Sequence, residues 1–256
     1  MLAKLSRTKP TRFQKLNNLD WLRLLFALQV AVAHSVSHLE QKSIGFLDNF
    51  PGVPAFFFVS GLLIYASYQN CNNIGDYARN RAMRLLPALV VVTFFGVFLA
   101  ISANSLEYAE QNYKTYFIWF FAQITLGQAY NPELFRNIGV GVINGSLWTI
   151  TTEILFYIFV PFISYAEKFI RGLIYYLLVI SFTVYAFGNS IFGVKLALGK
   201  TLFEFLGLTP IVWGWMFAFG IIAYKKFDFI AQFLPYFKYA AIPLIELLFL
   251  AKMKAL

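Results

Sequence analysis

The chain has 256 residues, of which 59% are hydrophobic and only 13% carry a charge. Soluble globular proteins have roughly a quarter of their residues charged, so this composition is typical of an integral membrane protein. The aromatic content of 20% excludes a disordered chain, and the single cysteine, Cys71, excludes a disulfide scaffold and a zinc ribbon. We expect no metal site.

The net charge of +9 would suit nucleic acid only if the cations formed a stripe on a folded surface, and they do not. Five of the 21 Lys and Arg residues lie in the first fifteen positions, ahead of the first apolar segment. Because cytoplasmic segments collect Lys and Arg, we expect residues 1–18 to be a basic cytoplasmic tail and residues 19–256 a single transmembrane domain. Arg23 interrupts the first apolar run, which favours a retained helix over a cleaved signal peptide.

Apolar stretches of roughly 20 residues, the length that a spanning helix needs, recur along the chain and predict an all-α polytopic bundle of about eight helices. They cover approximately residues 20–38, 54–70, 85–103, 114–129, 146–165, 172–192, 205–224 and 236–251. With the N-terminus inside, the positive-inside bias holds through the third stretch and is lost beyond it. Lys225 and Lys226 then fall on the predicted outer side.

Ionisable residues inside a membrane segment are costly, which makes them the first functional candidates. The first stretch carries Asp20, Arg23, His34 and His38, whose spacing puts them on one face of a helix. His34 would lie beyond the membrane midplane, where a neutral imidazole can accept a proton. The alternative is that Asp20 and Arg23 form an interfacial pair and that His34 is a hydrogen-bonded packing residue.

Two pairs of candidates lie around the second and third stretches. Ser60 and Gly61 are small residues inside a membrane segment, where they allow close helix packing; the missing side chain at Gly61 could equally admit a substrate. Arg81 and Arg84 are three residues apart, a spacing that presents two guanidinium groups on one side for phosphate. The alternative for the two arginines is ordinary anchoring at the cytoplasmic surface.

The fifth stretch carries a second polar stripe. Thr149, Glu153 and Tyr157 follow one another at four-residue steps on an otherwise apolar helix. A buried carboxylate there could orient an imidazole or an acceptor hydroxyl. The alternative is a protonated Glu153 hydrogen-bonded to a neighbouring helix.

Four blocks of the sequence, in order and with matching spacing, resemble the acyltransferase-3 family of integral membrane acyltransferases. The blocks are Leu19–Arg23 followed after ten residues by His34, Phe56–Ile64, Arg81–Pro87, and Leu147–Glu153 with Phe156, Tyr157 and Pro161. Thr149 stands where the family usually has Ser, which keeps a hydroxyl. Members are usually longer, so the resemblance implies a member that is short or truncated at its C-terminus.

The resemblance implies an O-acetyltransferase that moves an acyl group, commonly acetyl, from acetyl-CoA or another acyl-CoA to a hydroxyl of a cell-surface carbohydrate. The acceptor class would be a surface glycan, such as lipopolysaccharide or exopolysaccharide, or a lipid-linked sugar, and the location a bacterial inner membrane with a cytoplasmic N-terminus. By the same resemblance His34 is the catalytic residue, accompanied by Arg23 and Glu153. Arg81 and Arg84 would hold the coenzyme A phosphates, and Ser60 and Gly61 would lie beside the donor. The chemistry agrees, since acyl transfer from a thioester needs a base for the acceptor hydroxyl.

Two other functions remain open on the residues alone. Membrane-embedded His, Arg and Glu also line the substrate paths of a transporter or flippase, although the two related halves expected of such folds are not found. The short C-terminus is also compatible with an inactive membrane partner.

Overall fold

The computed structural model describes residues 18–38, 52–136, 138, 141–193 and 201–232. Every regular element in these ranges is a helix, which confirms the all-α prediction. Within them, five segments are long and apolar enough to cross a membrane: Gly52–Asn70, Ile74–Ala103, Gly145–Ala166, Leu173–Phe192 and Leu202–Lys225. The apolar part of the first helix, Trp21–Val32, is shorter. The chain is therefore a multi-pass membrane bundle.

The elements follow the apolar stretches closely, apart from the region around residue 120. In chain order they are α1 (Asn18–His38), α3 (Gly52–Asn70), α4 (Ile74–Ala103), α5 (Leu106–Gln111), α6 (Tyr113–Gln123), η2 (Glu133–Phe135), η3 (Gly145–Leu147), α7 (Trp148–Ala166), α8 (Leu173–Phe192), α9 (Leu202–Leu206) and α10 (Pro210–Lys225).

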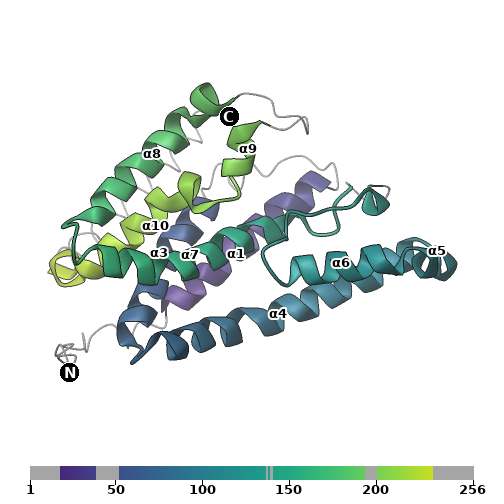
Figure 1. Cartoon of the computed structure of the whole chain (residues 1–256), viewed down its shortest axis with the longest axis horizontal. Helices are drawn as coiled ribbons and strands as arrows, with labels where there is room; N and C mark the ends of the chain where they lie inside the picture. Colours follow the sequence, from purple (N-terminus) through teal and green to yellow (C-terminus); the bar gives the residue numbers. More distant parts are fainter. Residues whose placement is uncertain (1–17, 39–51, 137, 139–140, 194–200, 233–256) are drawn as a thin grey trace, which may run out of the picture.

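The tightest packing joins α3 to α10, with α8 on the other side of α10 (Figure 1). Two glycines face each other across this seam. A Cβ atom on Gly61 would lie 2.1 Å from the carbonyl oxygen of Phe217, and one on Gly220 would lie 2.1 Å from that of Phe58. Only glycine allows two helix backbones to approach this closely.

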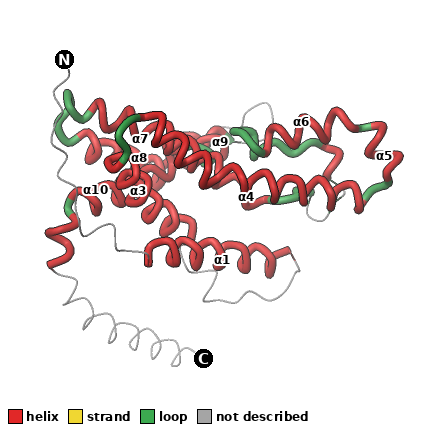
Figure 2. The backbone as a smooth tube through the Cα atoms, turned by 90° about the horizontal axis from the view of Figure 1, so that it is seen from below, coloured by secondary structure: helices red, strands yellow, loops and turns green. Residues whose placement is uncertain are grey.

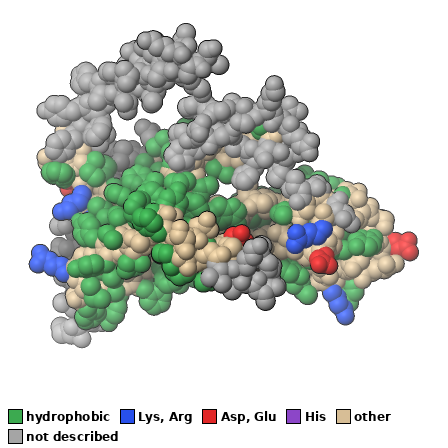
Figure 3. Space-filling view, turned by 90° about the horizontal axis from the view of Figure 1, so that it is seen from above, with side chains coloured by type: hydrophobic (Ala, Val, Ile, Leu, Met, Phe, Trp, Pro, Cys, Tyr) green, Lys and Arg blue, Asp and Glu red, His purple; other side chains and the backbone are tan. Residues whose placement is uncertain are grey.

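The helix α4 leaves this packed unit and carries α5 and α6 outward as an arm (Figure 2). It continues through an internal proline, Pro87, and many of its large apolar side chains are exposed, including Val91, Phe94 and Phe95. Figure 3 shows apolar side chains across the middle of one face, with the Lys and Arg side chains of that face toward its two ends. Exposed apolar surface of this extent fits a helix bundle that faces lipid.

The predicted span at 114–129 is not a full crossing. The helix α6 ends at Gln123 after 11 residues, a rise of about 16 Å, roughly half of the hydrocarbon core. The side-chain amide of Gln128 donates to the carbonyl of Gln123 (3.0 Å) and to that of Thr125, and Gln123 donates to the carbonyl of Tyr130 (3.1 Å). These amides close the chain into a turn that an apolar residue count does not detect. The predicted eighth span lies outside the described residues.

The loss of one crossing moves the later connections to the other end of the bundle. Lys225, the last residue of α10, pairs with Glu167 beyond α7 and places its ammonium 5.3 Å from the ring centroid of Tyr65 near the end of α3. The predicted topology put the α7–α8 connection and Lys225 on the side opposite the α3–α4 turn, whereas the structure brings them together. Most of the described cations gather at this end: Arg79, Arg81, Arg84, Lys168, Arg171, Lys225 and Lys226.

Candidate active site

A buried ion pair joins two of the predicted site residues across the bundle. Arg23 on α1 places Nη2 2.5 Å from Oε1 of Glu153 on α7, with side-chain exposures of 11% and 2%. Tyr157, one helical turn after Glu153, donates its hydroxyl to the same oxygen at 2.6 Å. Two donors, one from α1 and one from α7, therefore converge on a single oxygen of Glu153.

The Arg23 guanidinium also contacts α3, where it lies 4.8 Å from the ring centroid of Phe56. Its Nη1 atom is buried and has no hydrogen-bond partner among the described residues. A buried donor of this kind costs free energy unless something accepts from it. Arg23 therefore connects α1 to both α3 and α7. Its Nη1 atom is a hydrogen-bond donor that stays unsatisfied within the described structure.

A second arginine lies on the other side of Tyr157. Arg81 on α4 donates from Nη2 to Oγ of Ser67 at 2.9 Å, and its guanidinium carbon is 5.7 Å from the ring centroid of Tyr157. Its Nε and Nη1 atoms are buried and lack partners within the described structure. Tyr77, one turn earlier on α4, donates to the main-chain carbonyl of Tyr157 at 3.0 Å. A polar cluster thus runs from α1 through α7 to α4 and α3.

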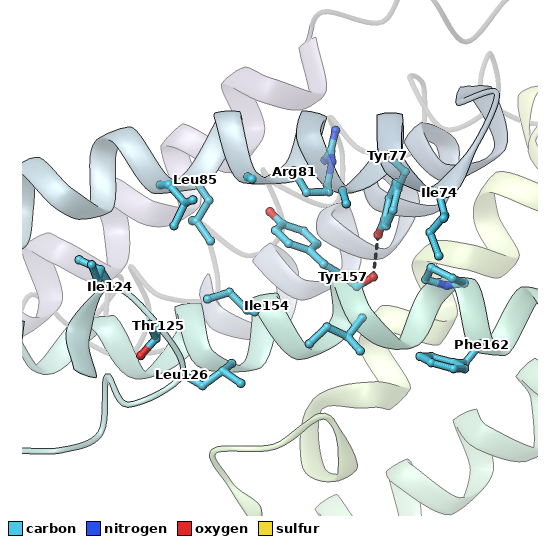
Figure 4. A pocket seen from close by; sticks show the side chains of 15 residues that line it. Ile74, Tyr77, Arg81, Leu85, Ile124, Thr125, Leu126, Ile154, Tyr157 and Phe162 are labelled. Carbon is cyan, nitrogen blue, oxygen red and sulfur yellow. Dashed lines mark hydrogen bonds between the residues drawn. The ribbon is translucent and has the colours of Figure 1, made fainter. Parts of the chain in front are cut away.

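Beside Arg81 lies the α4–α7 pocket, a cavity of about 440 Å³ shown in Figure 4. Its walls are mainly apolar side chains of α4, α7 and the turn after α6. The lining includes Tyr77, Arg81, Leu85, Ile154 and Tyr157. The guanidinium of Arg81 turns away from the α7 wall, so the pocket meets the stem of this side chain (Figure 4). An apolar slot with a cation at its edge suits an extended molecule with an anionic end.

The two arginines predicted to act together differ in burial. Arg81 is half-buried among α3, α4 and α7, whereas Arg84 is exposed on the outer surface of α4. The Thr149 hydroxyl donates to the carbonyl of Ser146 at 3.0 Å rather than joining the Glu153 stripe.

Ser60 and Gly61 are both fully buried in α3. Gly61 touches the backbone of α10, so helix packing accounts for it. The Ser60 hydroxyl has no hydrogen-bond partner among the described residues. Donor binding by these two residues stays a prediction. His34 and His38 lie on the last turns of α1, but their side chains and that of Asp20 are outside the described residues.

Sequence reasoning missed two residues of the cluster. Ser67 lies seven residues after Ser60, on the same face of α3, so its helical spacing was a usable signal. Tyr77 carries no signal, because a tyrosine at a helix start is ordinary in a membrane protein. Within the described ranges, no group of three or more His, Cys, Asp or Glu side chains is placed to hold a metal ion.

The comparisons with known proteins agree with the four blocks. A family model described as an acyltransferase domain, that of the acyltransferase-3 proteins, matches residues 16–252. The chain belongs to the acyltransferase-3 family. It is 28% identical to nodulation protein 10 of Rhizobium leguminosarum bv. viciae over 81% of this chain and 59% of that protein. It is 30% identical to an O-acetyl transferase of Shigella phage Sf6 over 56% of this chain and 44% of that protein.

This acyltransferase-3 chain therefore spans about half the length of the relatives it matches. No solved structure matches it. The four blocks that carry the family resemblance lie on α1, α3, α4 and α7, and residues from all four meet in the cluster of Arg23, Phe56, Arg81, Glu153 and Tyr157.

Proposed function

We propose that the chain is a membrane O-acyltransferase that moves an acyl group, acetyl by family resemblance, from acyl-CoA to a hydroxyl of a cell-surface carbohydrate. The observation that carries the proposal is the convergence of the four family blocks on one buried polar cluster in an apolar bundle. Buried ionisable groups of this kind mark functional sites in membrane proteins. The name of one relative, the O-acetyl transferase of Shigella phage Sf6, supports the same reaction class.

The reaction itself needs one base and one electrophile. The acceptor hydroxyl oxygen forms a bond to the thioester carbonyl carbon while His34, acting as general base, takes the hydroxyl proton. The carbon–sulfur bond then breaks, and the sulfur leaves as a thiolate that takes up a proton to give coenzyme A. The product is the acyl ester of the acceptor. We assign direct transfer with both substrates bound, because no side chain in the described ranges is placed as an acyl-accepting nucleophile.

The donor binds by its phosphates at the Arg81 end of the cluster. The Nε and Nη1 atoms of Arg81, which are buried and have no partner among the described residues, are suited to donate hydrogen bonds to an anionic oxygen. Arg84 is one turn further along and exposed, where it meets the outer part of the donor. The apolar α4–α7 pocket next to them has the shape for the uncharged arm that ends in the thioester.

Arg23 and Glu153 act as positioning residues rather than by touching the reacting atoms. His34 is eleven residues after Arg23, about 16 Å along the helix axis. The ion pair with Glu153 sets the depth of α1 against α7 and therefore the depth of His34.

The cytoplasm lies at the end of the bundle where the cations gather, in our proposal. The α3–α4 turn, the α7–α8 connection and the end of α10 share that end, which satisfies the positive-inside rule for the second half of the chain as well. A bacterial inner membrane is the location. Single cysteines introduced at Asn72, Arg171 and Lys226 in a Cys71→Ser chain should be labelled from the same side of sealed vesicles. Labelling of Lys226→Cys from the side opposite Asn72→Cys would refute this orientation.

The test is transfer of labelled acetyl groups by the purified full chain in detergent micelles. The donor is acetyl-CoA, and the acceptor is surface polysaccharide of the source cells from which ester groups have been removed by mild base. His34→Ala should reduce the rate by about 100-fold or more, the usual contribution of a general base, while His38→Ala serves as the matched control. Full activity of His34→Ala would refute the assignment of the base. Substrate movement into proteoliposomes without coenzyme A would instead favour a transporter, and failure to bind coenzyme A an inactive partner.

A further inference from the structure

A second cavity, of about 410 Å³, lies where the N-terminal ends of α7 and α10 meet the loops before them. We call it the α7–α9 pocket. Its lining comes from three separate segments: the turn after α6, the residues around η3, and the α9–α10 connection. The residues used below are Gln128, Asn131, Asn144, Trp148, Glu204 and Trp213.

Two tryptophans form an aromatic wall of this pocket. The rings of Trp148 and Trp213 have centroids 5.7 Å apart and planes inclined at 40°. The Trp213 indole nitrogen donates to the carbonyl of Gly207 at 2.8 Å, which fixes that ring to the α9–α10 connection. Trp213 is therefore held in place, and the two rings present apolar surface to a cavity whose other lining combines polar with apolar side chains, among them Val142, Phe205 and Leu208.

The polar groups divide into those that hold the pocket and those that remain available. Gln128 is 2% exposed, donates to two carbonyls and accepts from the Thr151 hydroxyl, so it forms the floor. Asn144 accepts the main-chain N–H of Ser146, which leaves its amide nitrogen as a donor. The Glu204 carboxylate is exposed and has no side-chain partner within the described structure. The pocket thus offers both donors and acceptors around an aromatic wall.

The pocket lies level with the part of α1 that carries His34. The element η3, which borders the pocket at Gly145, contacts α1. The Arg23–Glu153 pair joins α1 to α7 and serves as a common reference point. From Glu153 back to Gly145 the chain rises about 13 Å, and from Arg23 on to His34 it rises about 16 Å. Because α1 and α7 run in opposite directions (Figure 1), these two rises point the same way. Arg81 and the donor end lie in the other direction.

We infer that the α7–α9 pocket is the acceptor site and binds a pyranose ring, with its carbon–hydrogen face on Trp148 and its hydroxyl groups on Glu204, Asn131 and the Asn144 amide. This inference rests on the proposed function. A sugar ring has the two kinds of surface that the pocket has, an apolar face and a polar edge, and the cavity volume is in the range of small-molecule sites. The acceptor reaches His34 from the end opposite the donor.

The test measures KM for each substrate separately, with the full chain in detergent micelles, acetyl-CoA as donor and the base-treated surface polysaccharide as acceptor. Glu204→Ala should raise the acceptor KM about tenfold, the loss of a hydrogen bond to a charged group, and leave the acetyl-CoA KM unchanged. Trp148→Ala should raise it by a similar factor and Trp148→Phe by less, since a ring remains. Glu133→Ala, which removes an exposed acid outside the pocket, is the matched control.

The outcomes separate this inference from the proposed function. If the unmodified chain transfers acetyl groups and both Glu204→Ala and Trp148→Ala keep its acceptor KM, the α7–α9 pocket is not the acceptor site. If the unmodified chain transfers nothing and does not bind coenzyme A, the proposed function itself fails. Because Glu204 is exposed, we expect Glu204→Ala to fold normally. The acceptor KM of this variant therefore tests the inference even if Trp148→Ala fails to fold.

Discussion

The α4–α7 pocket and the α7–α9 pocket are of similar size but of opposite chemistry. The first has about 440 Å³ and apolar walls interrupted by Arg81, Tyr77 and Tyr157. The second has about 410 Å³ and collects amides, a carboxylate and two indoles. Both pockets border α7. The α4–α7 pocket lies along the middle and the C-terminal half of this helix, and the α7–α9 pocket lies at its N-terminal end. The Arg23–Glu153 pair lies between them.

On the proposed function, the difference would let one bundle bind two unlike substrates. A slot with apolar walls and a cation suits a chain with a phosphate end, and a polar pocket with aromatic surface suits a ring that carries hydroxyls. Hydroxyls in the apolar slot would lose their hydrogen bonds, so the α4–α7 pocket is the less suited of the two to a sugar. On the proposed function, the place of each pocket along α7 would separate donor from acceptor.

We expect the largest effect from breaking the Arg23–Glu153 ion pair, which lies between the two pockets. Glu153→Ala leaves Arg23 buried without its partner, and breaking a buried pair in this way costs about 3–5 kcal/mol of unfolding free energy. We expect a large fall in the melting temperature of the chain in detergent, measured by tryptophan fluorescence, and loss of acetyl transfer. The double variant Arg23→Met, Glu153→Leu should recover most of the stability but not the activity. Recovery of activity as well would show that the pair does not position α1.

The donor side of the comparison is tested by the two arginines that differ in burial. Arg81→Ala should raise the KM for acetyl-CoA about 10–100-fold, the usual value for losing hydrogen bonds from a charged group. Arg84→Ala should raise it less, because Arg84 is exposed. The acceptor KM should not change in either variant. Equal effects of the two substitutions on the acetyl-CoA KM would contradict the distinct role given to Arg81.

A substitution in the glycine seam tests whether the α7–α9 pocket depends on the packing of α10 against α3. Gly61→Ala places a methyl group against the backbone of Phe217 and should cost about 1–3 kcal/mol of stability through overpacking. Since α10 supplies Trp213 to the α7–α9 pocket, the acceptor KM should rise more than the donor KM. The control is Gly145→Ala, whose new Cβ would have its nearest neighbour 4.0 Å away. A destabilisation by Gly145→Ala equal to that of Gly61→Ala would contradict the seam.

The smallest effect is expected from the ion pair at the end where the cations gather. Lys225 and Glu167 are 30% and 13% exposed, so Lys225→Ala should change the unfolding free energy by less than about 1 kcal/mol. Both KM values should stay the same, because neither pocket includes these residues. A change in either KM would show that the α7–α8 connection communicates with a pocket.

The helical class, the long spans and the choice of Arg23, Arg81 and Glu153 as important residues all followed from the sequence. Hydropathy locates spans because each needs a run of apolar residues, and ionisable residues inside such runs stand out. The pairing of Arg23 with Glu153 did not follow, since the two lie 130 positions apart and nothing local fixes which helices pack together. The contact of Gly61 with α10 did not follow from the sequence for the same reason.

The error at 114–129 had a larger consequence than its length suggests. Counting that run as a crossing put the α7–α8 connection, with Lys225 and Lys226, at the end of the bundle opposite the α3–α4 turn. The loss of the positive-inside bias in the second half fits a miscounted crossing, because Lys and Arg tend to collect on one side. The amides of Gln123 and Gln128, read as turn residues, would have corrected it.

The proline inside α4 bears on how a donor bound as we propose would be released. Pro87 has no main-chain N–H, so the carbonyl of Met83 lacks its usual helical partner and α4 resists bending least at that point. The glycine seam packs α3 closely against α10, which restricts movement of these two helices. Motion on the donor side therefore falls on the first part of α4, which carries Tyr77 and Arg81. Product release would follow the swing of this half-helix about Pro87, and its rate would set the turnover of the enzyme wherever chemistry is faster.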